Sequence, residues 1–100
     1  MIKHIVLWKL AAQAEGADKQ ENALTIKRIL EDLKGKVPEI LRIEVGIDFS
    51  KSDASYDVAL YSEFASRADL DAYQNHPLHK KAAEFVGKVR TERVVVDYET

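Results

Sequence analysis

The sequence predicts a single α+β domain in which two helices cover one face of a four-stranded antiparallel sheet. The length of 100 residues fits one domain, which we place over residues 1–100. Segments with the two-residue period of strands and segments with helical period follow one another in the order β-α-β-β-α-β. No proline-rich or glycine-rich linker and no internal repeat interrupts this order.

The first predicted strand runs from Ile2 to Leu10 and is rich in β-branched and large apolar residues. Because side chains alternate along a strand, one face carries Ile2, His4, Val6, Trp8 and Leu10. The opposite face carries Lys3, Ile5, Leu7 and Lys9. Apolar residues occur on both faces, so we expect both faces to be covered.

A loop of small and polar residues is expected over residues 11–17, and a helix begins after it. Asp18 and Glu21 have the spacing of a capping box. An apolar stripe with helical spacing follows and consists of Ala23, Ile26, Ile29, Leu30 and Leu33. Gly35 is expected to end this helix, and Pro38 prevents its continuation.

Two strands joined by a polar turn are predicted next. Residues 40–49 alternate regularly, which indicates a half-buried strand with an apolar face made of Leu41, Ile43, Val45, Ile47 and Phe49. Ser50 to Ser55 is rich in serine and aspartate and is typical of a turn. Residues 56–64 form the third predicted strand.

The second helix is predicted to begin at a cap formed by Ser66 and Asp69 and to break at Asn75-His76-Pro77. Proline fits the first position of a helix, so a bend or a restart is expected there. The resumed helix has an apolar face with Leu78, Ala82 and Phe85, and Gly87 lies near its expected end. A last strand covers residues 89–98, with three consecutive valines at its centre.

Two split βαβ halves in this order form the ferredoxin-like fold. Both helices lie on one face of the sheet, so its second face, including Ile5 and Leu7, would expose a sizeable apolar patch. Monomeric proteins rarely expose such a patch, and a second copy with twofold symmetry would bury it. We therefore predict a homodimer in which the two sheets pack into a dimeric α+β barrel.

Composition excludes several classes of function. The net charge is −2 with both signs mixed along the chain, so no basic surface for nucleic acid is predicted. The apolar runs are too short to span a membrane, and the absence of a leader segment leads us to expect a cytoplasmic protein. With no cysteine, disulfides and thiolate chemistry are excluded. No phosphate-binding loop or nucleophile elbow is present, so no cofactor is predicted.

Five segments match a known family in order and spacing: Met1–Leu10, Ile43–Gly46, Tyr56–Val58, Asn75–His79 and Arg93–Tyr98. Through them the whole chain resembles the stress-responsive A/B barrel (Dabb) domain. The resemblance implies a dimeric α+β barrel. It also implies a possible activity, because the family includes a plant polyketide cyclase in which a histidine is the acid/base and no metal or cofactor takes part.

By this resemblance, His79 would transfer the proton, with Tyr73 and His4 as its supporting polar groups. The chain also departs from the cyclase. Trp8 replaces an aliphatic residue, Arg90 replaces a tryptophan, and the first helix lacks the aromatic residues that line the cyclase pocket. These departures indicate a different ligand.

The residue pattern itself also points to the two histidines. His79 precedes Ala82, Ala83 and Val86 at helical spacing, which places it on the inward stripe. His4 is expected to face the helices, so both imidazoles would approach one interior volume and exchange protons near neutral pH. Alternatively, each of these two histidines makes only a structural hydrogen bond and transfers no proton. Tyr73 either orients a histidine or packs its ring in the core.

Val6, Trp8 and Arg90 complete the candidate site. Trp8 would form a wall against an aromatic ligand or fill the core, and Arg90 would hold a carboxylate or remain solvated. His76 and His79 have no third ligand fixed by spacing, so no metal site is predicted.

Three functions follow from this candidate site. The first is cofactor-free proton transfer, of the cyclase or isomerase kind, on a small hydrophobic or aromatic acid. The protein could equally carry such an acid without reacting it. The second is a stress-associated structural dimer with a filled core. The third is a cofactor-free monooxygenase, which rests on architecture alone.

Overall fold

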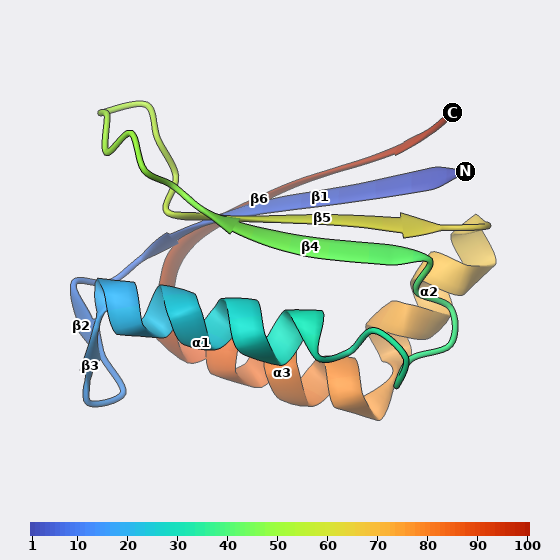
Figure 1. Ribbon diagram of the computed structural model, residues 1–100, viewed down its shortest axis with the longest axis horizontal. Coiled ribbons are helices and arrows are strands. Elements are labelled where there is room, and N and C mark those ends of the chain that lie inside the picture. Colours follow the sequence, from blue (N-terminus) through green and yellow to red (C-terminus); the bar gives the residue numbers. More distant parts are fainter.

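The computed structural model describes all residues from 1 to 100 and contains the predicted elements in the predicted order (Figure 1). A short hairpin lies between the first strand and the first helix. The elements are β1 (Ile2–Leu10), β2 (Gln13–Ala14), β3 (Ala17–Asp18), α1 (Lys19–Glu31), β4 (Arg42–Ile47), β5 (Val58–Phe64), α2 (Arg67–Asn75), α3 (Pro77–Val89) and β6 (Arg90–Glu99).

The main sheet is antiparallel throughout, with the strand order β4-β5-β1-β6. All three helices lie on one side of it, and α1 and α3 run next to each other beneath the strands (Figure 1). This arrangement is the ferredoxin-like α+β fold, which confirms the predicted fold class. No helix is both long and apolar enough to cross a membrane.

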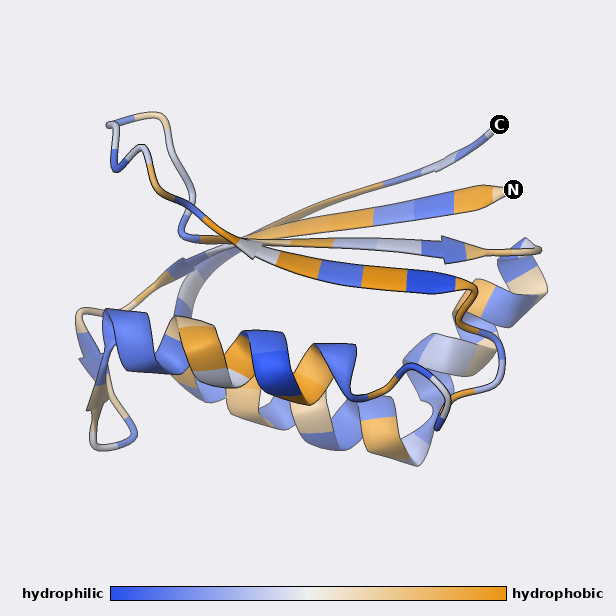
Figure 2. Cartoon of the chain, viewed as in Figure 1, coloured by the Kyte–Doolittle hydropathy of each residue, from blue (hydrophilic) through white to orange (hydrophobic).

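The core lies between the sheet and the helices. The predicted inward face of β1 is buried at every position from Ile2 to Leu10, whereas the residues between them are half-buried. Apolar and polar residues also alternate along β4 (Figure 2). The two-residue period therefore assigned the faces of these strands correctly.

The predicted helix starts are confirmed by their caps. The Asp18 carboxylate accepts a hydrogen bond of 2.8 Å from the Glu21 N–H, and the Ser66 hydroxyl accepts one of 3.1 Å from the Asp69 N–H. His76 ends α2 and begins α3, with Pro77 as the first residue of α3. The chain thus restarts a helix at the predicted proline.

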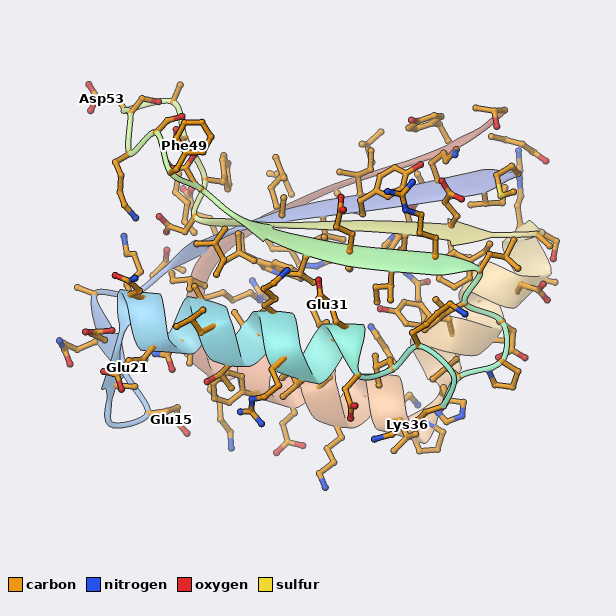
Figure 3. The ribbon with its side chains drawn as sticks, in the orientation of Figure 1. Glu15, Glu21, Glu31, Lys36, Phe49 and Asp53 are labelled. Carbon is orange, nitrogen blue, oxygen red and sulfur yellow. The ribbon has the colours of Figure 1, made fainter.

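Several predicted boundaries were wrong. Strand β4 is shorter than residues 40–49, and Phe49 is 92% exposed on the loop that follows it (Figure 3). The chain leaves the sheet at Asp48 because its carboxylate accepts a hydrogen bond of 2.7 Å from the Lys51 N–H and closes a turn. Residues 11–17 are not wholly loop, since they contribute to the β2–β3 hairpin.

The ends of the helices also differ from the prediction. Helix α1 ends at Glu31, and Gly35, with a φ of +87°, lies in the turn that follows. Helix α3 continues through Gly87 to Val89. Because Val86 and Val89 are both buried, their packing outweighs the roughly 1 kcal/mol that an internal glycine costs a helix.

The outer face of the sheet carries the predicted apolar patch. Val94 lies opposite Leu7 and Val96 lies opposite Ile5, so these four side chains share the face that no helix covers. Val94 and Val96 are 42% and 53% exposed. We call these four residues the outer apolar patch.

Candidate functional site

A cavity of about 130 Å³ lies between the sheet and the helices α2 and α3. All six predicted site residues line it: His4, Val6, Trp8, Tyr73, His79 and Arg90. The volume is below the roughly 300 Å³ at which ligand pockets usually begin. It is close to that of an engineered cavity of about 150 Å³ that binds benzene. The cavity therefore suits a ligand no larger than a single ring.

The break between α2 and α3 brings Tyr73 and His79 together. Their ring centroids are 4.4 Å apart with an angle of 51° between the planes. The sequence left this geometry open because the bend at Pro77 could direct α3 several ways. The His4 ring reaches Tyr73 from β1 at a centroid distance of 6.3 Å. Three polar rings from three elements thus surround one cavity.

The same break fixes the tautomer of His79. In a continuous helix the Leu78 N–H would bond to the Gln74 carbonyl, but here it donates to Nδ1 of His76 at 3.1 Å. Nδ1 of His79 lies 3.1 Å from the Gln74 oxygen instead. Since a carbonyl only accepts, Nδ1 carries the hydrogen, and Nε2 of the neutral ring keeps its lone pair.

Burial also favours the neutral form of His79. Desolvation lowers the pKa of this imidazole, and the nearby charges of His4 and Arg93 lower it further, although the bond to Gln74 opposes them. A neutral imidazole with a free Nε2 is the form in which histidine accepts a proton. Nε2 of His79 is thus available as a proton acceptor.

His4 is held by Asp97 on β6. Asp97 lies directly opposite His4 across the β1–β6 pair, and its Oδ1 bonds to Nδ1 of His4. The register of these two strands places both side chains on the helix side of the sheet. This contact engages Nδ1 of His4, and Nε2 makes no hydrogen bond to the protein.

Tyr73 carries a buried hydroxyl without a partner. Its side chain is 0% exposed, and its oxygen is the single buried side-chain polar atom that makes no hydrogen bond. Desolvation raises the pKa of this phenol far above its usual value, so the hydroxyl keeps its hydrogen. An unpaired buried donor of this kind costs about 1–3 kcal/mol of stability.

Two arginines lie where the cavity meets solvent. Arg90 was predicted, whereas Arg93 was missed and lines the cavity from the position opposite Trp8. Neither guanidinium takes part in a salt bridge. The two-residue period of the last strand was the available signal, because it places Arg93 and Asp97 on the same face. Trp8 is buried and serves as a wall of both core and cavity.

No group of three or more histidine, aspartate or glutamate side chains in the structure is placed to hold a metal ion. His76, which the sequence pairs with His79 at i, i+3, instead caps α3 through its Nδ1 atom. The cavity therefore contains hydrogen-bonding groups and cations on an apolar wall.

Comparisons with known proteins agree with this fold. The family described as the stress responsive A/B barrel domain (Dabb) matches residues 2–100. A search of curated proteins finds no match. A dimeric protein of unknown function and ferredoxin-like fold from Bacteroides fragilis is 33% identical, with a TM-score of 0.85 over 99% of this chain and 95% of that one.

Two solved enzymes share the fold at lower identity. A hydroxynitrile lyase from Passiflora edulis is 23% identical, with a TM-score of 0.81 over 97% of this chain and 90% of that one. An antibiotic biosynthesis monooxygenase is 16% identical, with a TM-score of 0.76 over 100% and 98% of the two chains. At these identities the two enzymes show the fold alone.

Proposed function

This chain belongs to the stress-responsive A/B barrel (Dabb) family, and from that premise we propose that it is a cofactor-free acid–base catalyst for a small carbonyl compound carrying an acidic group. One observation carries the proposal. The buried Tyr73 hydroxyl has no partner in the protein, and the Tyr73 ring packs against the ring of His79, whose tautomer leaves Nε2 free. Tyr73 and His79 both line the same small cavity, so a hydrogen-bond donor and a base come from adjacent side chains.

In the proposed reaction, Nε2 of His79 removes a proton from the carbon next to a carbonyl group. The electron pair of the broken C–H bond moves toward the carbonyl oxygen, which accepts a hydrogen bond from Tyr73. His79 then returns the proton to the product. Return to a different atom gives an isomerase, and attack of the carbanion on a second carbonyl within the substrate gives a cyclase.

Lyase chemistry belongs to the same proposal. Splitting a hydroxynitrile into a carbonyl compound and cyanide also needs a base that removes a proton, here from a hydroxyl group, while the C–C bond breaks. The likeness to the hydroxynitrile lyase supports this option at the level of fold.

The remaining cavity residues would bind and orient the substrate. Val6 and Trp8 provide an apolar wall, and the unpaired Arg90 and Arg93 suit a carboxylate. Asp97 would stabilise a positive charge on His4, which makes His4 a second proton carrier. The volume of about 130 Å³ limits the substrate to a short chain or a single ring.

The proposal includes a homodimer. The Bacteroides fragilis protein is dimeric, and the outer apolar patch here is partly exposed in the single chain. Pairing of two outer faces would bury these side chains and leave the cavity on the helix side of each sheet.

The test is proton exchange at carbon. Pyruvate and 2-oxobutyrate are incubated with the protein in D₂O, and loss of the C3 proton signal is followed by NMR. We expect wild type to accelerate exchange, and Tyr73→Phe and His79→Gln to lower that acceleration by about 10²–10⁴-fold. Benzoate serves as a non-reacting probe of binding. No exchange with either oxo acid, together with no binding of benzoate, would overturn the proposal.

The free energy of unfolding of Tyr73→Phe distinguishes a catalytic role of the hydroxyl from a structural one. Removing an unpaired buried hydroxyl is expected to leave the free energy of unfolding unchanged or to raise it by about 1 kcal/mol. Tyr73→Phe should thus be as stable as wild type and still lose activity. A large loss of stability would mean that the hydroxyl has a structural role.

A second candidate is a structural dimer without a ligand. Two observations favour it: each cavity imidazole already bonds to protein through one nitrogen, and the cavity is small. Under this hypothesis His79→Ala lowers stability by about 1–3 kcal/mol, because the Gln74 carbonyl loses its partner. An unchanged melting temperature would count against it.

A further inference from the structure

A second concave surface lies on the side of the helices that faces away from the sheet. It has a volume of about 380 Å³, and its lining comes from α1, α3 and the turn after α1, without any strand residue. We call it the α1–α3 groove. It shares no residue with the histidine cavity. Its volume lies within the range of roughly 300–1,000 Å³ that is usual for ligand pockets.

The lining of the groove combines apolar side chains with three cations and the carboxylate of Asp32. Ile29, Phe85 and Leu78 are partly or fully accessible in this lining, and Leu78 is 39% exposed. Such accessible apolar surface favours a ligand with a hydrocarbon part.

Three cations line the groove, and only one of them is paired. Lys36, which follows α1 (Figure 3), bonds to Asp32 at 2.5 Å. Arg28 on α1 and Lys81 on α3 make no salt bridge. The protein as a whole has a net charge of −2, so this local excess of positive charge does not follow from composition. The groove therefore complements an anion attached to an apolar chain.

We propose that the α1–α3 groove binds the monomeric anion of a medium-chain carboxylic acid. The carboxylate would contact Arg28 and Lys81, and the hydrocarbon chain would cover Phe85 and Ile29. This proposal is independent of the proposed function. Because the groove and the outer apolar patch lie on opposite sides of the molecule, pairing of two sheets would leave the groove open.

The experiment is a titration of the full-length protein with decanoate below its micelle concentration, followed by calorimetry and by ¹⁵N NMR. Decanol, which has the same chain without the charge, is the matched probe. We expect saturable decanoate binding, with shifts at the amides of α1 and α3. Decanol should bind about tenfold more weakly.

Two double variants with equal change of charge test the cations. Arg28→Gln/Lys81→Gln removes the two unpaired cations of the groove and should weaken decanoate binding about tenfold. Lys34→Gln/Lys80→Gln removes two cations that neither line the groove nor form salt bridges, and it should change binding less than about twofold.

Three outcomes would overturn the proposal. One is the absence of saturable decanoate binding to wild type. Another is an equal loss of affinity in both double variants. The third is a set of shifts centred on His4 and Trp8, which would place the acid in the histidine cavity.

Discussion

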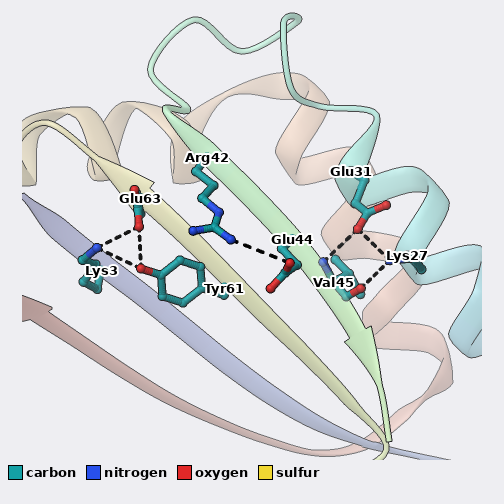
Figure 4. A network of polar contacts seen from close by, with 8 residues as sticks. All are labelled: Lys3, Lys27, Glu31, Arg42, Glu44, Val45, Tyr61 and Glu63. Atoms are coloured by element: carbon teal, nitrogen blue, oxygen red, sulfur yellow. Dashed lines mark hydrogen bonds and ion pairs between the residues drawn. The ribbon is translucent and has the colours of Figure 1, made fainter.

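The two edges of the main sheet are finished in different ways. At the β4 edge, α1 closes the strand with side chains: the Glu31 carboxylate accepts a bond of 3.0 Å from the Val45 N–H, and the Lys27 ammonium donates one of 2.6 Å to the Val45 carbonyl (Figure 4). At the β6 edge, every residue from Arg90 to Glu99 is exposed. Even Val95, whose position opposite Val6 places it on the helix side, is 46% exposed.

The two edges also differ in which residues they leave available. At the β4 edge, α1 satisfies both backbone groups of Val45, whose side chain is buried. Strand β6 supplies Arg90 and Arg93 to the lining of the cavity and Asp97 to the bond with His4, and it carries part of the outer apolar patch. Groups that remain available to a ligand or to a second copy therefore gather at the edge that no helix closes.

The largest expected effect concerns the outer side of β6. Val96→Glu would place an unpaired charge in the proposed dimer interface and should weaken self-association more than about 100-fold, since such a burial costs about 3–5 kcal/mol. Val95→Glu is the matched control, because it lies next in the same strand but on the helix side. Sedimentation measures both. Dissociation of both variants to the same extent would contradict the assignment of faces.

A pair of alanine substitutions compares the packing of the two halves. Ile26 on α1 is 0% exposed, so Ile26→Ala should lower the free energy of unfolding by about 2–5 kcal/mol. Val95→Ala in the open half should cost about 0.5 kcal/mol or less. Urea unfolding gives both values. Similar losses would show that the two halves are equally packed.

A pH titration tests the burial of His79 in the cavity. Burial lowers the pKa of this imidazole below its ordinary value of 6.5. The unfolded chain then binds more protons than the folded one, so stability should fall as pH drops below about 6.5 and level off beneath the folded-state pKa. His79→Gln should remove this part of the pH dependence. An NMR titration that puts the pKa of His79 at or above 6.5 would refute the expectation.

The smallest expected effect concerns the clamp of α1 on β4, by which we mean the bonds of Lys27 and Glu31 to the Val45 backbone. Bonds to Lys27 and to the Val45 N–H lower the pKa of Glu31, so its contribution is present above pH 4.5 and is lost as pH falls through the folded-state pKa. Glu31→Gln should cost about 0.5–1 kcal/mol at neutral pH, a modest value because the side chain is 35% exposed. Glu84→Gln, in the exposed pair with Lys88, should cost about 0.3 kcal/mol or less. Equal losses in denaturant unfolding would mean that the clamp adds nothing.

The outer face of the sheet shows how polar groups limit the apolar patch. Lys3 donates hydrogen bonds to Tyr61 at 2.9 Å and to Glu63 at 2.7 Å, and Arg42 pairs with Glu44 at 3.8 Å (Figure 4). These residues border the four apolar side chains at one end. Charged side chains therefore limit the outer apolar patch. The patch lies on the face of β1 that the alternation predicted to be covered.

Local spacing in the sequence was sufficient for most of the fold. The alternation in β1 separated buried from half-buried positions, because a strand has only two faces. The caps at Asp18 and Ser66 and the restart at Pro77 depend on neighbouring backbone groups, so they too could be predicted. The same local information put His4 and His79 on inward faces.

Only the tertiary structure decided the rest. The pairing of Asp97 with His4 depends on the register of two strands that are more than 80 residues apart in the chain, which no local pattern specifies. Three consecutive valines in β6 made both of its faces apolar, so alternation could not show which one remained open. Gly87 stays helical because Val86 and Val89 are buried. The volume of the cavity and the unpaired hydroxyl of Tyr73 depend on how the sheet and helices pack, which is why the sequence could name the site residues but not the size of their ligand.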